Sequence, residues 1–178
     1  MKMTMKQQSS RFTVPDWLKW PIIVLLILFF ITAVMGVWLY SDAQNDKNSQ
    51  DQEARTLAIQ NTALSTVQNV TVYHGEETVH IVEGTEENGS EGLAFVQADQ
   101  QSVLEYVKAK DVLSMDGMKS QWRSSCESCN FKKVQYAFEE GEPVFELTYI
   151  DEQNRYVFDY FTLTGESFDQ RFAFKQNN

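Results

Sequence analysis

Cys126 and Cys129 are the only cysteines of the chain, and their spacing, Cys-Glu-Ser-Cys, is its sharpest chemical motif. A redox-active pair needs a cysteine at a helix N-terminus, where the dipole stabilises a thiolate. This pair instead follows a predicted helix, and Glu127 between the sulfurs disfavours a thiolate. A structural zinc site usually has four ligands, and this cysteine pair supplies only two. In an oxidising compartment we expect a local disulfide; free thiols and a redox or metal role are the alternatives.

The other ionisable side chains predict no catalytic site. His74 and His80 lie in one predicted hairpin, and no serine stands in a G-x-S-x-G pattern. Adjacent acidic pairs occur at 76–77, 86–87, 139–140 and 151–152. All fall in predicted turns, where charges are solvated, whereas a glycosidase needs two carboxylates in a groove. We therefore expect a non-enzymatic protein without a cofactor or a dedicated metal site, although weak calcium binding by the acidic surface stays open.

Aromatic residues are concentrated in the C-terminal third of the chain, at positions 131, 136, 138, 145, 149, 156, 158, 160, 161, 168, 172 and 174. Strand alternation places such rings on both faces of a sheet. One face is expected to meet a helix at Met118 and Trp122. The other is either a seam between two repeats or an exposed patch, and exposed aromatic patches mark protein interfaces. The candidate interaction surface is Phe158, Tyr160, Phe172 and Phe174, for which core packing is the simpler interpretation.

These groups are carried by a chain that begins with a membrane anchor. Residues 20–40 contain no charge, and 21 residues of helix match a hydrocarbon core of roughly 30 Å. Pro21 is expected in the first helical turn, where its missing N–H costs nothing. Aromatic rings bracket the run at Trp17, Trp20, Trp38 and Tyr40. A cleaved signal peptide is the alternative, with small residues at 41–43, but the apolar run is longer than a signal peptide needs.

Charge predicts the orientation of the anchor. Residues 1–40 carry a net charge of +3, and the remainder carries −13. Cations before the span and anions after it place the N-terminus in the cytoplasm and the C-terminal domain outside the cell membrane. The acidic body also repels phosphate backbones, which argues against a nucleic-acid partner.

The residues that follow the anchor are predicted to form an α+β domain. A stalk helix is predicted over 50–68, with a disordered linker as the alternative near residue 45. Paired strands follow at 69–73 and 78–82, and at 93–97 and 103–108. Ser114 can cap a short helix that ends near Ser125, and strands follow at 132–138, 144–150, 156–161 and 167–174. The order indicates two small repeats, each a helix covering an antiparallel sheet, that pack together.

The expected organisation is a cytoplasmic segment over 1–19, a transmembrane anchor over 20–40, a stalk helix with the first repeat over 41–110, and a second repeat over 111–178. Each repeat alone has too few residues to bury a generous core.

The last strands resemble a known repeat. A strand at 144–150, the acidic turn at Asp151, a strand at 156–160 and the turn at 164–166 are similar to the PepSY, or peptidase-propeptide-like, repeat. With the anchor, the hairpin over 70–82 and the segment 83–85, the chain resembles the YpmB/TseB family, single-pass membrane proteins of Gram-positive bacteria. Asn154 departs from the pattern, because many relatives have Gly there. Asn also tolerates a left-handed turn, so the fold is expected to persist.

This resemblance implies a role in cell wall elongation and a class B penicillin-binding protein, a peptidoglycan transpeptidase, as the partner. The first hypothesis is therefore a membrane-anchored adaptor of cell wall synthesis. An alternative is a PepSY-like inhibitor of a cell-surface peptidase. A third is a thiol oxidoreductase that acts through Cys126 and Cys129.

Overall fold

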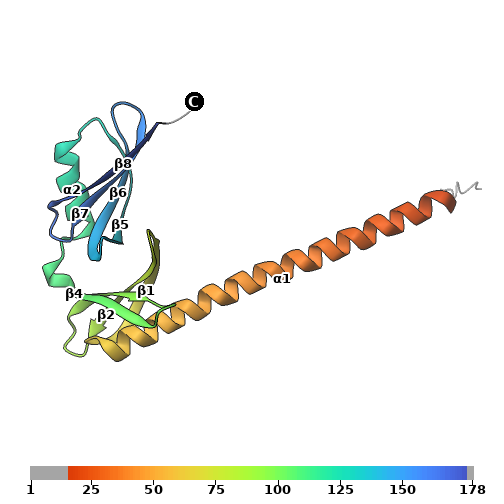
Figure 1. Cartoon of the computed structure of the whole chain (residues 1–178), viewed down its shortest axis with the longest axis horizontal. Helices are drawn as coiled ribbons and strands as arrows, with labels where there is room; N and C mark the ends of the chain where they lie inside the picture. Colours follow the sequence, from red (N-terminus) through yellow and green to blue (C-terminus); the bar gives the residue numbers. More distant parts are fainter. Residues whose placement is uncertain (1–15, 176–178) are drawn as a thin grey trace, which may run out of the picture. The chain divides into compact units, whose positions relative to one another are not determined.

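The structure is a computed structural model that describes residues 16–175 (Figure 1). These residues form a long helix, two four-stranded antiparallel sheets and a short helix, with a 3-10 turn after the first sheet. This order confirms the predicted α+β fold. The chain divides into two compact units, one ending at Asp46 and one spanning Lys47–Asn178. The expected cytoplasmic segment over 1–19 lies mostly outside the described residues.

Helix α1 spans Asp16–Asn61. One stretch within it, Lys19–Asp42, is long and apolar enough to cross a membrane, and all of its side chains are exposed. Exposed apolar side chains on every side of a helix are typical of a lipid-facing span. Pro21 lies inside α1 rather than in its first turn, because the helix begins at Asp16. The expected position of Pro21 was therefore wrong.

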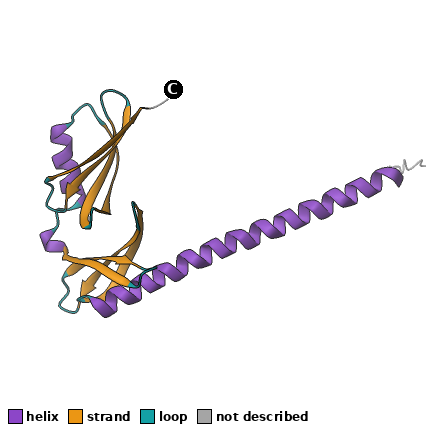
Figure 2. Cartoon of the chain, viewed as in Figure 1, coloured by secondary structure: helices purple, strands orange, loops and turns teal. Residues whose placement is uncertain are grey.

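The first repeat contains β1 (Leu64–His74), β2 (Thr78–Glu86), β3 (Glu91–Gln97) and β4 (Ser102–Lys108). These strands pair in chain order into an antiparallel sheet. Figure 2 draws the strands in orange and the helices in purple. The C-terminal part of α1 covers one face of this sheet. Ala54 and Ala58 are fully buried there beside Val82. The small alanines let the helix backbone approach the sheet closely.

The predicted stalk helix ends too late. We expected it to continue to Gln68, but α1 ends at Asn61 and β1 begins at Leu64. Leu64 and Val67 still pack in the core between α1 and the sheet, as expected, but from a strand. The β-branched residues of β1 favour a strand, and pairing with β2 begins at Leu64. The expected burial of Leu64 and Val67 therefore did not distinguish a helix from a strand.

The second repeat follows the 3-10 helix η1 (Ala109–Asp111). It contains α2 (Met115–Ser125), β5 (Asn130–Glu139), β6 (Glu142–Ile150), β7 (Arg155–Thr162) and β8 (Ser167–Lys175). As predicted, Ser114 caps α2 by accepting a hydrogen bond of 3.0 Å from the backbone N–H of Gly117. Trp122 is buried, and its ring lies 5.0 Å from that of Tyr149 on β6. The expected contact between α2 and one face of the sheet is confirmed.

The two repeats share one core. The rings of Phe95 on β3 and Phe138 on β5 have centroids 5.9 Å apart. Buried side chains from β2, β3, α2 and the second sheet belong to the same apolar cluster. Strand β5 is thus the edge of the second sheet that meets the first repeat. The predicted packing of one repeat on the other follows from this shared core.

The turn at Asn154 has the predicted backbone conformation. Its φ is 58°, in the left-handed region, and its N–H donates to the carbonyl of Asp151 at 3.0 Å. Asparagine is one of the few residues other than Gly that adopts this region at low cost. The departure from the family pattern therefore leaves the turn between β6 and β7 intact.

Candidate protein-interaction surface

The four residues predicted as an interaction surface come together on the face of the second sheet opposite α2. Phe158 and Tyr160 lie on β7, Phe172 and Phe174 lie on β8, and Phe158 is paired with Phe172 in register. The rings of Phe158 and Phe174 are 6.1 Å apart, and those of Tyr160 and Phe172 are 6.3 Å apart. All four line one concavity of about 500 Å³, which we call the aromatic groove.

The four residues differ in their exposure. Phe172 is 45% exposed and Phe174 57%, and outside α1 they are the exposed large apolar side chains of the described residues. Tyr160 is only 5% exposed, so it forms the floor of the groove rather than its rim. An exposed pair of phenylalanines on a sheet face is typical of a surface that another molecule covers.

A tyrosine from the first repeat closes one end of the aromatic groove. Tyr73, near the end of β1, donates a hydrogen bond from its hydroxyl to Glu139 on β5. The hydroxyl of Tyr160 donates to Glu146 at 3.0 Å, and the two tyrosine oxygens are 3.4 Å apart. The expected alternatives, a seam or an exposed patch, therefore both apply: the seam at Tyr73 continues into the patch at Phe172.

Burial dominates the electrostatics of this cluster. It raises the pKa of Tyr160 to about 12, and the neighbouring Glu146 acts in the same direction. It also raises the pKa of Tyr73, assisted by the hydrogen bond to Glu139. Both hydroxyls consequently stay protonated at neutral pH and remain hydrogen-bond donors to the carboxylates.

The hairpin turn after β1 fits closely against the second sheet. A Cβ atom at Gly75 would lie 2.5 Å from Cε1 of Tyr73 and 2.6 Å from Oε1 of Glu139. Only glycine permits this approach without moving a neighbour. Gly75 lies between the strands predicted at 69–73 and 78–82, and its contact with the second repeat was not foreseen.

All four of the acidic pairs predicted to be solvated contain a carboxylate that is hydrogen-bonded, and in the pair 76–77 Glu77 accepts from Gln97 at 2.6 Å. Glu139 accepts from Tyr73, and Glu86, 9% exposed, accepts from Tyr106 at 2.7 Å. Asp151 is 8% exposed and pairs with the guanidinium of Arg155 at 2.6 Å. Although burial acts against it, hydrogen bonds from Arg155 lower the pKa of Asp151. These groups were wrongly assigned as merely solvated, because sequence adjacency does not reveal the partner across the sheet.

Glu146 and Tyr73 were missed by the sequence reasoning. A usable signal existed for Glu146, which interrupts the otherwise uncharged run 143–150 of β6 and is 6% exposed. A charged residue in the middle of a buried strand indicates a specific set of hydrogen-bond partners. No comparable signal marked Tyr73, because its partners lie 66 or more residues away in the chain.

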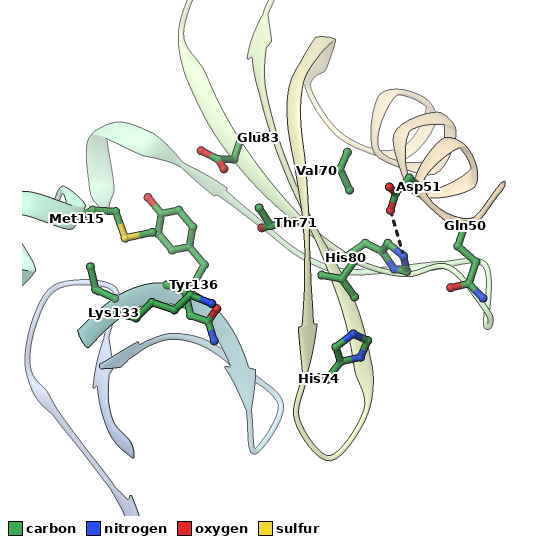
Figure 3. Close-up of a pocket in the computed structure, with 13 residues that line it drawn as sticks. Gln50, Asp51, Val70, Thr71, His74, His80, Glu83, Met115, Lys133 and Tyr136 are labelled. Carbon is green, nitrogen blue, oxygen red and sulfur yellow. Dashed lines mark ion pairs between the residues drawn. The ribbon is translucent and has the colours of Figure 1, made fainter. Parts of the chain in front are cut away.

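A larger concavity, of about 810 Å³, lies between the edge strands β1 and β5 (Figure 3). In Figure 3, Met115, Lys133 and Tyr136 lie on one side of it and His80 lies on the other, next to Asp51 of α1. The Nε2 atom of His80 is 3.7 Å from Oδ1 of Asp51. This cavity is lined by both edge strands and by the C-terminal part of α1.

The histidines show no catalytic arrangement within the described residues. His80 is 3% exposed, and burial lowers its pKa, whereas Asp51 and Asp99 act to raise it. His74 is exposed, with Nδ1 3.4 Å from the hydroxyl of Thr78. Among residues 16–175, no group of three His, Cys, Asp or Glu side chains is arranged to hold a metal ion.

The sulfur atoms of Cys126 and Cys129 are bonded to each other, with 5.4 Å between the Cα atoms. Cys126 is the C-cap of α2, and Cys129 is buried. Arg123 donates a hydrogen bond of 2.9 Å to the carbonyl of Cys129. The pair thus lies at the C-terminus of a helix, where the dipole opposes a thiolate, and it closes the corner between α2 and β5.

Comparisons with known proteins agree with one another. Residues 53–97 match the family model described as "Cell wall elongation regulator TseB-like domain". The chain is 25% identical over 138 residues to the "Probable cell wall elongation regulator TseB" of Bacillus subtilis (strain 168), covering 78% of this chain and 86% of that protein. The solved structure titled "YpmB protein from Bacillus subtilis" matches with a TM-score of 0.62 and 25% identity, over 68% of this chain and 95% of that chain.

Proposed function

The chain is a member of the YpmB/TseB family, and from this premise we propose that it is a non-enzymatic, membrane-anchored regulator of cell wall elongation. The name of its Bacillus relative supports the regulatory role. The domain that carries out this role is the unit Lys47–Asn178, whose repeats share one core.

The observation that carries the proposal is the aromatic groove. Among the described strands of the domain, Phe172 and Phe174 are the large apolar side chains that remain exposed. A groove with exposed rings suits contact with a protein, because aromatic anchors contribute most of the binding energy at interfaces.

We place this domain on the extracytoplasmic side. The basic residues that precede the span and the −13 charge that follows it support this orientation. The stretch Lys19–Asp42 then acts as a single-pass anchor in the cell membrane.

The proposed partner is a class B penicillin-binding protein, which the family membership implies. Two proteins that are confined to one membrane meet at a raised effective concentration, so a modest interface is sufficient.

Co-purification tests the proposal. The full-length chain is expressed with an affinity tag, crosslinked in native membranes and purified, and bound proteins are identified by mass spectrometry. We expect a class B penicillin-binding protein, with recovery strongly reduced by Phe172→Ser together with Phe174→Ser. Ile59→Ser is the matched control, because Ile59 is 44% exposed but lies on α1. Recovery of a cell-surface peptidase alone would instead favour the inhibitor hypothesis.

A further inference from the structure

Glu146 is a buried carboxylate whose hydrogen-bond donors are all neutral. It is 6% exposed and accepts from Gln135 at 2.7 Å and from Tyr160 at 3.0 Å, with Tyr73 at 3.4 Å. Within residues 16–175, no lysine or arginine forms an ion pair with it. A buried charge is costly unless a countercharge accompanies it. The floor of the aromatic groove therefore carries a carboxyl group without a cationic partner among the described residues.

Two further carboxylates line the same groove, those of Glu76 and Glu139, and its described lining contains no lysine or arginine. The nearest basic side chain of β8, Arg171, belongs to the opposite face, where it donates to the hydroxyl of Tyr149 at 2.9 Å. Walls with one sign of charge and low polarity concentrate the electric field. The groove thus attracts a cation.

Aromatic rings lie beside these carboxylates. Phe158 and Phe174 meet edge to face at 80°, and Phe172 meets Tyr160 at 87°. A guanidinium group suits such a place, because it stacks on an aromatic face and donates a two-pronged hydrogen bond to a carboxylate. A lysine ammonium suits it less well, because it is a strongly hydrated point charge and lacks the planar fork of the guanidinium.

We propose that the aromatic groove receives an arginine side chain from a segment of the partner protein. The guanidinium lies against Phe172 and bonds to Glu139, and an apolar neighbour in the same segment covers Phe174. This inference rests on the proposed function and specifies the chemistry of the partner segment. The same negative charge excludes a nucleic acid or an anionic lipid as the occupant.

Site-specific photo-crosslinking tests this. The full-length chain carries p-benzoylphenylalanine in place of Phe174 and is irradiated in native membranes, and the crosslinked partner peptide is sequenced by mass spectrometry. We expect an arginine within about three residues of the crosslink, a reach set by the spacing of about 3.3 Å per residue in an extended segment. Glu139→Gln is expected to lower the yield about tenfold, the scale of one charge-assisted hydrogen bond.

Glu142→Gln is the matched control, because Glu142 is exposed and faces Glu139 across the β5–β6 ladder but does not line the groove. The inference is overturned if Glu139→Gln and Glu142→Gln give equal yields, if the captured segment lacks arginine, or if Phe174 captures only lipid, a second copy of the chain or nothing. If a penicillin-binding protein still co-purifies in those cases, the proposed function is retained and only the arginine inference is rejected. Capture of an arginine-containing segment from another protein would support arginine binding in the groove and contradict the proposed partner.

Discussion

The hydroxyl oxygens of Tyr73 and Tyr160 lie 3.4 Å apart, although the two residues are 87 positions apart in the sequence. Tyr73 belongs to the hairpin of the first repeat, and Tyr160 belongs to a central strand of the second sheet. The junction between the repeats and the floor of the aromatic groove are therefore one structure. A change at the junction alters the shape of the groove.

Tyr73→Phe should weaken this junction. The substitution removes the hydroxyl that Glu139 accepts from and leaves a half-buried carboxylate with one donor fewer. We expect a loss of about 1–3 kcal/mol in the free energy of unfolding, measured by urea denaturation of the segment Lys47–Asn178. Tyr106→Phe is the control, because its hydroxyl bonds to Glu86 within the first repeat and its loss should not affect the second. Equal loss of protection from hydrogen exchange in both repeats for both variants would contradict the assigned role of Tyr73.

Trp122→Ala should be the more damaging core substitution. Trp122 is 2% exposed, and its ring lies 5.5 Å from Phe131 and 5.0 Å from Tyr149. Removing a buried indole leaves a cavity between α2 and the sheet, and we expect a loss of about 3–5 kcal/mol, with lowered secondary structure by circular dichroism. Ser124→Ala, on the exposed side of α2, should change stability by no more than about 0.5 kcal/mol. A Trp122→Ala protein as stable as the parent would mean that α2 does not cover the sheet.

Stability should fall in mild acid because of His80. Its pKa is lowered in the folded protein, so the unfolded chain binds a proton first as the pH drops below 6.5. The contribution of neutral His80 is thus complete above that pH and is lost as the pH falls toward the folded pKa. The groups that face it are Asp51 on α1, Asp99 in the β3–β4 turn and His74 on β1.

The check is the difference in unfolding free energy between the parent and His80→Gln from pH 7 to pH 5. The parent should lose more stability over this range, with a slope approaching but not exceeding about 1.4 kcal/mol per pH unit. Asp51→Asn should steepen the loss, because Asp51 acts to raise the pKa of His80. His74→Gln should flatten the loss, because His74 acts to lower the pKa of His80. Parallel curves of unfolding free energy against pH for the parent and His80→Gln would refute the role assigned to His80.

Cys126 and Cys129 should stabilise the corner after α2 without taking part in function. The disulfide closes a loop of only a few residues, so replacing both cysteines by serine should cost at most roughly 2 kcal/mol. Alkylation and mass measurement of the protein taken from the membrane should find both thiols blocked. Binding of the partner should persist in the double variant. If binding is abolished while the fold remains intact, the thiol oxidoreductase hypothesis regains support.

The sequence predicted the elements best where local chemistry is sufficient. Ser114 identified the start of α2 because capping depends on one side chain and a nearby N–H group. The strands of the second sheet lie within about two residues of their predicted ranges, because turns and alternation are local signals. The end of α1 was missed by seven residues, since Leu64 and Val67 fit the helical spacing equally well.

The aromatic groove was predictable only in part. We proposed Phe158, Tyr160, Phe172 and Phe174 as a surface on one face, and in the structure all four line the aromatic groove. Strand alternation did not reveal that Tyr160 is buried or that Tyr73 and Glu139 close the groove. Those contacts depend on how the first repeat packs on the second, and no local pattern encodes that arrangement.

The compartment is the central claim, because the disulfide, the partner and the use of the aromatic groove all depend on it. A dual reporter of alkaline phosphatase and green fluorescent protein fused after Asn178 tests it directly, since the phosphatase is active only outside the cytoplasm. We predict phosphatase activity at the surface of intact cells without fluorescence in the cytoplasm. Fluorescence without phosphatase activity would contradict the account.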